Sequence, residues 1–402
     1  FYQDSLRWIE DPLFGWCNKN YNKEGKPYNI YADGLKVYTT LDSRMQKYAE
    51  EAVYDHVVNY LQPAFDKENK KKPNAPYSGK LSKEQLNKIL QRSVRQSERY
   101  RLMKNSGASE EEINKAFNTP CEMSIFTYKG NRDTVMTPLD SIKHYKSFLR
   151  CGFLSMDPKN GAVKAYVGGL NFVHFNYDMC MEGKRQVGST IKPLLYSLAM
   201  ENGFSPCDSV PNVEQTYVVA GKNWTPRNGS RRRYGELVSL KWGLAQSNNW
   251  ISAYLMSKLN PEAFVELLKE YGIRNPEIHP SMSLCLGPCD ISVGEMVSAY
   301  TAFANHGIRC APMLVTRIED REGSVITHFQ PRMSEVISDE SASKMIHMLK
   351  GVVDGGTGGR LRFKYNIRCE MGGKTGTTNN NSDAWFMGVT PTLVSGVWVG
   401  GD

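Results

Sequence analysis

The chain has 402 residues, of which 40% are hydrophobic and 23% are charged. This composition is typical of a globular protein with a large core and two domains. The longest apolar runs, such as PLLYSLAM, are far too short to cross a bilayer. The nine cysteines are scattered and no second Cys or His pair accompanies Cys285 and Cys289. Their spacing therefore indicates neither a disulfide scaffold nor a metal cage, and we predict no metal site and no cofactor.

The formal net charge of +8 comes partly from KENKKKP (67–73) and from a basic segment at 83–104. Such charge favours a solvated surface, or alternatively attraction to an anionic polymer or a membrane face. No nucleic-acid-binding motif accompanies it, so we predict no nucleic-acid partner. The chain opens with FYQDSLRWIEDP, without a leader pattern, and we expect it to be a piece of a longer protein.

The first regular elements are a strand and a long helix. DGLKVYTTL (33–41) alternates and is β-branched, which predicts a strand. Apolar residues at helical spacing predict a helix over 42–61, capped by Asp42 or by Ser43 with Gln46. Residues 62–80 are rich in Lys, Pro, Asn and Gly and predict a loop.

Two capping boxes follow, at Ser82–Gln85 and at Ser109–Glu112, and each predicts the start of a helix. This helical pair, at about 78–118, has the character of an insertion. A DNA-binding helix-turn-helix is the alternative, but the joining turn at Gly107 is a common helix-stop signal.

Hairpins dominate the rest of the N-terminal half and the C-terminal end. Residues 122–137 and 153–169 each predict two strands joined by a turn, with a short helix between the hairpins. Residues 235–350 are mainly helical in pattern, and three short strands close the chain after 370. Consecutive hairpins imply an antiparallel sheet with helices packed on it, which is an α+β fold with a mainly helical lobe.

Ser189 and Lys192, in GSTIKP, carry the clearest chemistry. Residues three apart on a helix share a face, so the serine hydroxyl and the lysine amine can meet. A neutral lysine can take the serine proton, and burial or a nearby cation such as Lys374 lowers a lysine pKa. Pro193 is tolerated only near a helix start, so we expect the helix to begin within a residue or two of Ser189.

Two further elements complete a pattern with this pair. LAQSNNW supplies Ser247 and Asn249, and GGKTGTT supplies Lys374, Thr375 and Gly376 on a predicted strand. Other catalytic motifs are not present. The histidines are dispersed and no G-x-S-x-G surrounds a serine, which argues against a Ser-His-Asp hydrolase. Arg368 stands where a phosphate-binding loop needs its first glycine, which argues against nucleotide binding. The glycine-rich GGTGGR is expected to be a flexible connection. The order S-x-x-K, S-x-N, K-T-G is typical of active-serine penicillin-interacting enzymes.

With these motifs the sequence resembles class A penicillin-binding proteins, over roughly 33–61 and 150–402. RQVGSTIKP, GGKTGTTNNNSDAWFMGVTP and ANHGIRCAP all match patterns of that family. The resemblance implies the penicillin-binding-protein/β-lactamase-like transpeptidase fold. It also implies a linker or pedestal region at 1–149 and a transpeptidase domain at 150–402. The family's glycosyltransferase domain and membrane anchor are absent from this chain, so an anchor is expected only in the full-length protein.

The resemblance also implies residue roles. Ser189 attacks the penultimate D-Ala of a peptidoglycan stem peptide, and Lys192 takes its proton. Ser247, with Lys374, relays a proton to the leaving amine, and Asn249 binds Lys192 and the substrate amide. The backbone N–H groups of Ser189 and Thr377 form the oxyanion hole. Thr375 and Thr377, on the strand that Gly376 leaves accessible, bind the substrate carboxylate.

The implied activity is D,D-transpeptidation on the extracytoplasmic side of the bacterial inner membrane, with β-lactams as covalent inhibitors. Three alternatives stay open from sequence. A D,D-carboxypeptidase differs only in its acceptor. A β-lactamase-like hydrolase needs a base for water, which the sequence does not identify. A non-catalytic penicillin-sensing domain would keep the same residues.

Overall fold

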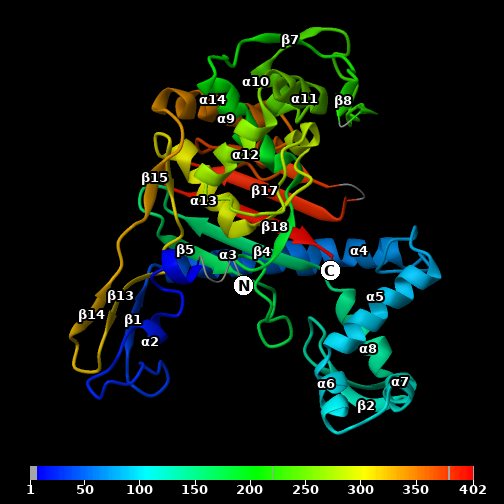
Figure 1. Ribbon diagram of the computed structural model, residues 1–402. Coiled ribbons are helices and arrows are strands. Elements are labelled where there is room, and N and C mark those ends of the chain that lie inside the picture. Colours follow the sequence, from blue (N-terminus) through cyan, green and yellow to red (C-terminus); the bar gives the residue numbers. More distant parts are fainter. Residues whose placement is uncertain (1–6, 220, 379–380, 402) are drawn as a thin grey trace.

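A five-stranded antiparallel sheet forms the centre of the molecule (Figure 1), with strand order β16-β17-β18-β4-β5. The computed structural model describes residues 7–219, 221–378 and 381–401. The strands are β4 (Arg150–Met156), β5 (Val163–Val167), β16 (Gly372–Thr377), β17 (Asp383–Val389) and β18 (Val394–Gly400). The hairpin predicted at 153–169 and the three C-terminal strands are therefore confirmed. β18 pairs with β4, so the two ends of the C-terminal region meet in one sheet.

Helices cover both faces of this sheet, which confirms the α+β prediction. Leu154, Met156 and Trp398 face the helical lobe, whereas Cys151 and Ala165 face α3 on the other side. This alternation is what period-two side chains produce in a sheet buried on both faces. The lobe consists of α9 (Lys192–Glu201), α10 (Leu240–Ala245), α11 (Asn249–Lys258), α12 (Pro261–Glu270), α13 (Val293–Ala304), α14 (Asp339–Gly355) and α15 (Arg360–Phe363).

The long N-terminal helix runs beneath the sheet (Figure 1) as α3 (Ser43–Tyr54), a π-helix η1 (Asp55–Leu61) and α4 (Gln62–Asn69). Asp42 caps it by accepting the backbone N–H groups of Arg44 and Met45. The side chain of Gln46 bonds the backbone of Tyr166 in β5 and does not complete a capping box. The loop predicted at 62–80 is wrong for 62–69. Gln62 is buried and bonds the backbone of Ser147 and Leu149, which keeps the chain helical there.

A second sheet joins an N-terminal strand to two strands at residues 315–328. β1 (Lys36–Thr39) pairs with β13 (Val315–Glu319), and β13 pairs with β14 (Val325–His328). Trp16, in α2 (Trp16–Lys19), packs on this sheet. The predicted strand at 33–41 is confirmed, but the mainly helical prediction fails at 308–335, where β12 (Ile308–Cys310) and β15 (Met333–Glu335) also pair. Only the β1–β13 pairing joins segments far apart in sequence, which a local pattern does not contain. β13 and β14 form a hairpin of adjacent strands, enclosed by the β12–β15 pair, and the sequence pattern was misassigned there.

The insertion projects away from the sheet on the side of α4 (Figure 1). Both predicted capping boxes form, at Ser82 and Ser109. The helical pair is, however, three helices, because Ser97 ends one helix and caps the next. A small core of its own holds the insertion together, centred on Val94, Ile113 and Phe117. The elements are α5 (Lys83–Gln96), α6 (Glu98–Asn105), α7 (Glu110–Asn118), β2 (Cys121–Ile125), β3 (Arg132–Met136) and α8 (Pro138–Lys146).

Short paired strands and two 3-10 turns connect the helices of the lobe. They are β6 (Lys184–Gln186), η2 (Gly188–Ile191), β7 (Ser209–Pro211), β8 (Tyr217–Val219), β9 (Lys222–Trp224), β10 (Leu237–Ser239), η3 (Met282–Leu286) and β11 (Asp290–Ser292). All nine cysteines are free, and five of them are buried. Among the described residues, no helix combines the length and the apolar character that a membrane span requires.

Candidate active site

Ser189 lies in a tight turn at the start of the most buried helix of the lobe. Helical backbone begins at Gly188 as the 3-10 turn η2 and continues as α9 from Lys192, with Pro193 in its first turn. The predicted helix start near Ser189 is therefore confirmed, although the first turn is 3-10 and not α. In a 3-10 turn, side chains three apart eclipse each other. Ser189 and Lys192 thus lie on one side of the turn.

Gly188 brings this turn against the edge strand β16. Its φ of +52° is in the left-handed region, and a Cβ there would lie 3.0 Å from the carbonyl oxygen of Thr377. A side chain would therefore be strained and crowded at this position. Gly376, next along β16, approaches Thr190 and Val187 equally closely. The two predicted oxyanion donors, on Ser189 and Thr377, belong to these adjoining segments.

The Lys192 amine is fully buried and points at the second motif. Nζ donates to the carbonyl oxygen of Ser247 at 2.7 Å and to Oδ1 of Asn249 at 2.6 Å. The Ser247 hydroxyl lies 3.4 Å away. A neutral amine has two N–H groups and one lone pair. Two short hydrogen bonds therefore leave the lone pair available to accept a proton.

Ser247 occupies the turn between α10 and α11 with a φ of +53°. A serine rarely adopts this left-handed conformation, and such strain is concentrated at functional sites. The neighbouring Asn248 is buried and caps α11, which fixes the turn. Asn249 is held by Asn228 through its backbone N–H and by the Arg227 carbonyl through its side-chain amide.

Lys374 reaches the same hydroxyl from the opposite side. Its Nζ donates to Ser247 Oγ at 2.9 Å and to the Thr375 carbonyl at 2.8 Å, and it is also fully buried. β16 is the edge of the central sheet and pairs only with β17. An edge strand can accept an extended ligand along its free side. The structure thus brings together Lys192, Ser247, Asn249 and Lys374 from segments up to 182 residues apart.

The electrostatics of this cluster favour neutral amines. Burial lowers the pKa of Lys192 to about 7. Burial, together with the nearby charge of Lys192, holds the pKa of Lys374 well below its ordinary value. Two buried amines that share one hydroxyl cannot both be protonated without strong repulsion. The pair therefore suits proton transfer near neutral pH.

Several supporting residues were not predicted from the sequence. Thr357, in GGTGGR, lies with its Oγ1 2.6 Å from Thr375 Oγ1. Gly356 packs against the Ala245 carbonyl, so GGTGGR borders β16 and is more than a connection. Gly287 lies so close to Gly188 that a Cβ would be 2.1 Å from the Gly188 carbonyl oxygen. The signal that could have found it is the break LCLGPCD in an otherwise helical pattern.

Asp383 anchors the strand that carries the active-site motif. Its carboxylate accepts hydrogen bonds from Arg185 Nε at 2.9 Å, Trp398 Nε1 at 3.0 Å and Thr378 Oγ1 at 2.8 Å. Arg185 lies in the same RQVGSTIKP segment as Ser189. The carboxylate is buried, so it ties β6 to both β16 and β18.

Replacing this carboxylate should destabilise the protein strongly. We expect Asp383→Ala to reduce the free energy of unfolding by about 3–5 kcal/mol, because it leaves the partly buried Arg185 unpaired. For a chain of this length this corresponds to a fall in Tm of roughly 4–6 °C, measured by thermal unfolding. Asp133→Ala, on the exposed part of β3, is the control and should leave Tm nearly unchanged. A fall of less than about 1 °C for Asp383→Ala would contradict this anchoring role.

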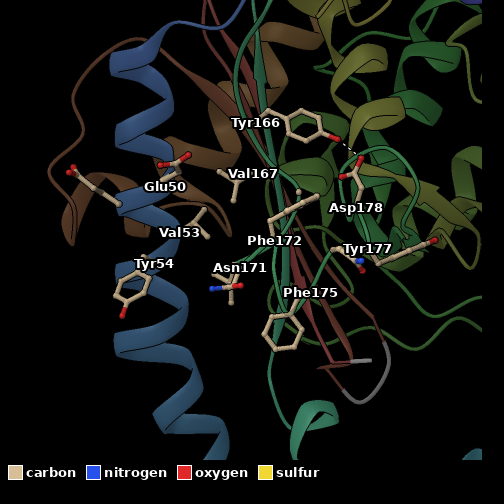
Figure 2. A pocket seen from close by; sticks show the side chains of 15 residues that line it. Glu50, Val53, Tyr54, Tyr166, Val167, Asn171, Phe172, Phe175, Tyr177 and Asp178 are labelled. Carbon is tan, nitrogen blue, oxygen red and sulfur yellow. Dashed lines mark hydrogen bonds between the residues drawn. The ribbon is translucent and has the colours of Figure 1, made fainter. Parts of the chain in front are cut away.

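Of two cavities, a small and a large one, only the small one contacts a residue of the cluster formed by Lys192, Ser247, Asn249 and Lys374. A small cavity of about 220 Å³ adjoins Ser247 and is also lined by Asn228 and Trp242. A larger one of about 870 Å³ lies at the β5 edge of the sheet, between α3 and the segment that follows β5 (Figure 2). It contains none of the predicted site residues. The chemistry therefore follows from the lysine cluster and not from cavity size.

Comparison with protein families places this geometry in a defined class. The penicillin binding protein transpeptidase domain matches residues 151–399, and the penicillin-binding protein middle domain matches residues 72–149. The chain therefore belongs to the penicillin-binding protein transpeptidase family. The division into domains at residues 149 and 150 stays a prediction. The pairing of β1 with β13 connects the N-terminal region 1–149 with the region 150–402.

The individual relatives confirm the resemblance to class A proteins. The chain is 29% identical over 392 residues to penicillin-binding protein 1A of Aquifex aeolicus, covering 95% of this chain and 52% of the relative. It is 27% identical over 451 residues to penicillin-binding protein 1A of Pseudomonas aeruginosa, covering 92% of this chain and 54% of the relative. The chain thus spans about half the length of the curated relatives it matches.

Solved structures support the fold. Penicillin-binding protein 1A from Haemophilus influenzae superposes with a TM-score of 0.68 at 22% identity, covering 92% of this chain and 63% of that chain. PonA1 from Mycobacterium tuberculosis in complex with penicillin V superposes with a TM-score of 0.53 at 24% identity, covering 79% of this chain and 84% of that chain. The penicillin-binding transpeptidase fold predicted from the motifs is confirmed.

Proposed function

We propose that this chain is a D,D-transpeptidase that cross-links peptidoglycan stem peptides through a serine acyl-enzyme. The observation that carries the proposal is the convergence of two buried lysines on Ser247, with Lys192 three residues after Ser189. Family membership and the penicillin V complex of PonA1 add support. The same arrangement would make Ser189 the target of β-lactams.

In the first half-reaction, Ser189 Oγ attacks the carbonyl carbon of the penultimate D-Ala while its proton passes to the neutral Lys192 amine. The C–N bond to the terminal D-Ala then breaks. Ser247, hydrogen-bonded to both lysines, relays a proton to the leaving nitrogen, so D-Ala departs as a neutral amine. Lys192 is regenerated in this transfer, and an ester joins the peptide to Ser189.

In the second half-reaction, an amine of a neighbouring stem peptide attacks the ester carbonyl. It loses a proton to the same lysine–serine relay, and the Ser189 oxygen leaves as a hydroxyl after reprotonation. The products are a new amide cross-link and free enzyme. Both half-reactions pass through an oxyanion, which the N–H groups of Ser189 and Thr377 would stabilise by about 3–4 kcal/mol each.

Binding of the donor peptide would use the free edge of β16. Gly376 is packed against Val187 and Thr190. The strand therefore offers its partly exposed Thr375 and exposed Thr377, which flank Gly376 next to Lys374. A terminal carboxylate suits two hydroxyl donors, and its negative charge would favour protonation of the Lys374 amine when the donor binds. Asn249 has one side-chain N–H on the Arg227 carbonyl and a second N–H for the substrate amide. We further propose an extracytoplasmic location, where peptidoglycan is assembled.

The test is to incubate the chain with a D-Ala-D-Ala peptide, with and without an added amine acceptor. A transpeptidase releases D-Ala and forms the amide with the acceptor, detected by mass spectrometry. Hydrolysed peptide as the dominant product in both arms would indicate a D,D-carboxypeptidase instead.

Incubation with a chromogenic β-lactam separates the other two alternatives. A stable adduct with D-Ala release supports the transpeptidase. Rapid turnover of the β-lactam would indicate a hydrolase, and a stable adduct without any D-Ala release would indicate a penicillin-sensing domain. Either of these results would overturn the proposed function.

A further inference from the structure

A second polar cavity of about 520 Å³ lies away from the lysine cluster. Its walls come from the N-terminal segment around Glu10, the strand β6, the start of α13 and the end of α12. Five cationic and four acidic side chains line it. None of them belongs to the reaction proposed above.

The charges of this cavity are almost, but not fully, balanced. Three arginines have carboxylate partners: Arg7 pairs with Glu182 at 2.7 Å, Arg274 with Glu10 at 2.5 Å and Arg332 with Asp11 at 3.9 Å. Lys184 lies 3.7 Å from Glu295, whose carboxylate also accepts the Ser292 backbone N–H. Four cations are thus matched by four acids, and the fifth cation of the lining is Arg309.

Arg309 has no carboxylate partner in the described part of the chain. Its Nε donates to the Ser298 hydroxyl at 3.0 Å. Three guanidinium atoms lie 2.3–2.6 Å from where a Gly272 Cβ would stand, so one face of the guanidinium rests on that glycine. The Nε of Arg309 is therefore occupied by Ser298, and one face of its guanidinium group is covered by Gly272. The two Nη groups, which form the fork that binds oxyanions, make no hydrogen bond to any residue that the structure describes.

This arrangement is costly for an arginine without a ligand. Burial lowers the pKa of Arg309, and the charges of Arg332 and Arg274 lower it further, against a smaller opposing effect of Glu295. A partly desolvated cation among like charges is destabilising unless an anion compensates it. The carboxyl end of α12, at Gly272, carries a partial negative charge that offsets only part of this cost.

We propose that this cavity binds an oxyanion, the carboxylate or phosphate group of a ligand, held by the Nη groups of Arg309. Arg274 and Arg332 would supply the surrounding positive potential. A guanidinium fork matches a planar carboxylate or two phosphate oxygens in a bidentate way. Because Arg309 is the single cation of the lining that no carboxylate pairs with among the described residues, a ligand with one negative charge would neutralise the cavity. The proposal does not depend on the acyl-transfer function.

Thermal unfolding of the purified chain tests it. We expect inorganic phosphate or acetate to raise Tm in a saturable way, by about 2 °C, relative to sodium chloride at matched ionic strength. A rise in the phosphate arm alone identifies a phosphate site, and a rise in the acetate arm alone a carboxylate site. Calorimetric titration of the parent chain with the same two anions gives a measurement that needs no variant.

Arg309→Gln should abolish the rise. Arg309→Lys should weaken it, because it keeps the charge but loses the fork. Arg101→Gln, which removes the same charge from the exposed helix α6, should keep it in full. The proposal is overturned if neither anion stabilises or binds the parent chain beyond chloride. It is also overturned if Arg309→Gln retains the effect, or if Arg101→Gln loses as much as Arg309→Gln.

Discussion

Ser189→Ala should abolish covalent labelling by a fluorescent penicillin. In the proposed mechanism, Ser189 supplies the oxygen that becomes part of the ester. We expect the acylation rate to fall by on the order of 10⁴–10⁶-fold, as for nucleophile removal in other serine enzymes. Gel fluorescence measures the loss. Mass spectrometry of the labelled parent should place the adduct on the peptide that contains Ser189.

The matched control is Ser93→Ala, which removes a hydroxyl from α5 in the insertion and should label at the rate of the parent. If Ser189→Ala labels as quickly as the parent, the nucleophile is a different residue. If both variants lose labelling, the loss reflects misfolding, and the Tm of each variant would reveal it.

Lys192→Met should slow acylation by about 10²–10⁴-fold at neutral pH, because it removes the proposed general base while keeping roughly the length of the side chain. Stopped-flow or quenched labelling measures the rate constant. Lys88→Met, on the exposed face of α5, is the control and should have no effect. A Lys192→Met rate within threefold of the parent would show that another group takes the Ser189 proton.

The pH dependence provides an independent test of the same role. The base must be unprotonated, and the pKa of Lys192 is about 7. The acylation rate of the parent should therefore rise roughly tenfold between about pH 6 and pH 8 and then level off. Lys192→Met should lose this rise. A parent rate that falls or stays constant over this range would contradict the assignment.

Stability should respond to pH in the same direction. The lysine pKa is about 10.4 in an unfolded chain and about 7 in the folded protein. The unfolded state therefore binds more protons between these values, so stability rises with pH over that window. Lys192→Met should flatten this rise in Tm. This readout distinguishes loss of a buried titrating amine from a general loss of structure.

Local patterns predicted much of the fold. The hairpins at 122–137 and 153–169, the C-terminal strands and both capping boxes depend on neighbouring residues, and all of them form. Pairings between distant segments were missed. The pairing of β1 with β13 joins segments about 280 residues apart, which a local pattern does not contain. The hairpin of β13 and β14 is local, and it was wrongly assigned to a helical region. The helix over 62–69 depends on Gln62 bonding to residues 147–149, which are equally invisible locally.

The sequence by itself determined which groups are present and the spacing of each motif. Ser189 and Lys192 lie three apart, so any helical turn places them on one side, and Pro193 limits where that turn can start. Only the tertiary structure decided what surrounds them. Burial of Lys192 and Lys374, their shared contact with Ser247 and the left-handed backbone of Ser247 all require segments that meet across the core. Desolvation is a property of packing, which is why the amine acidity cannot be obtained from the motif alone.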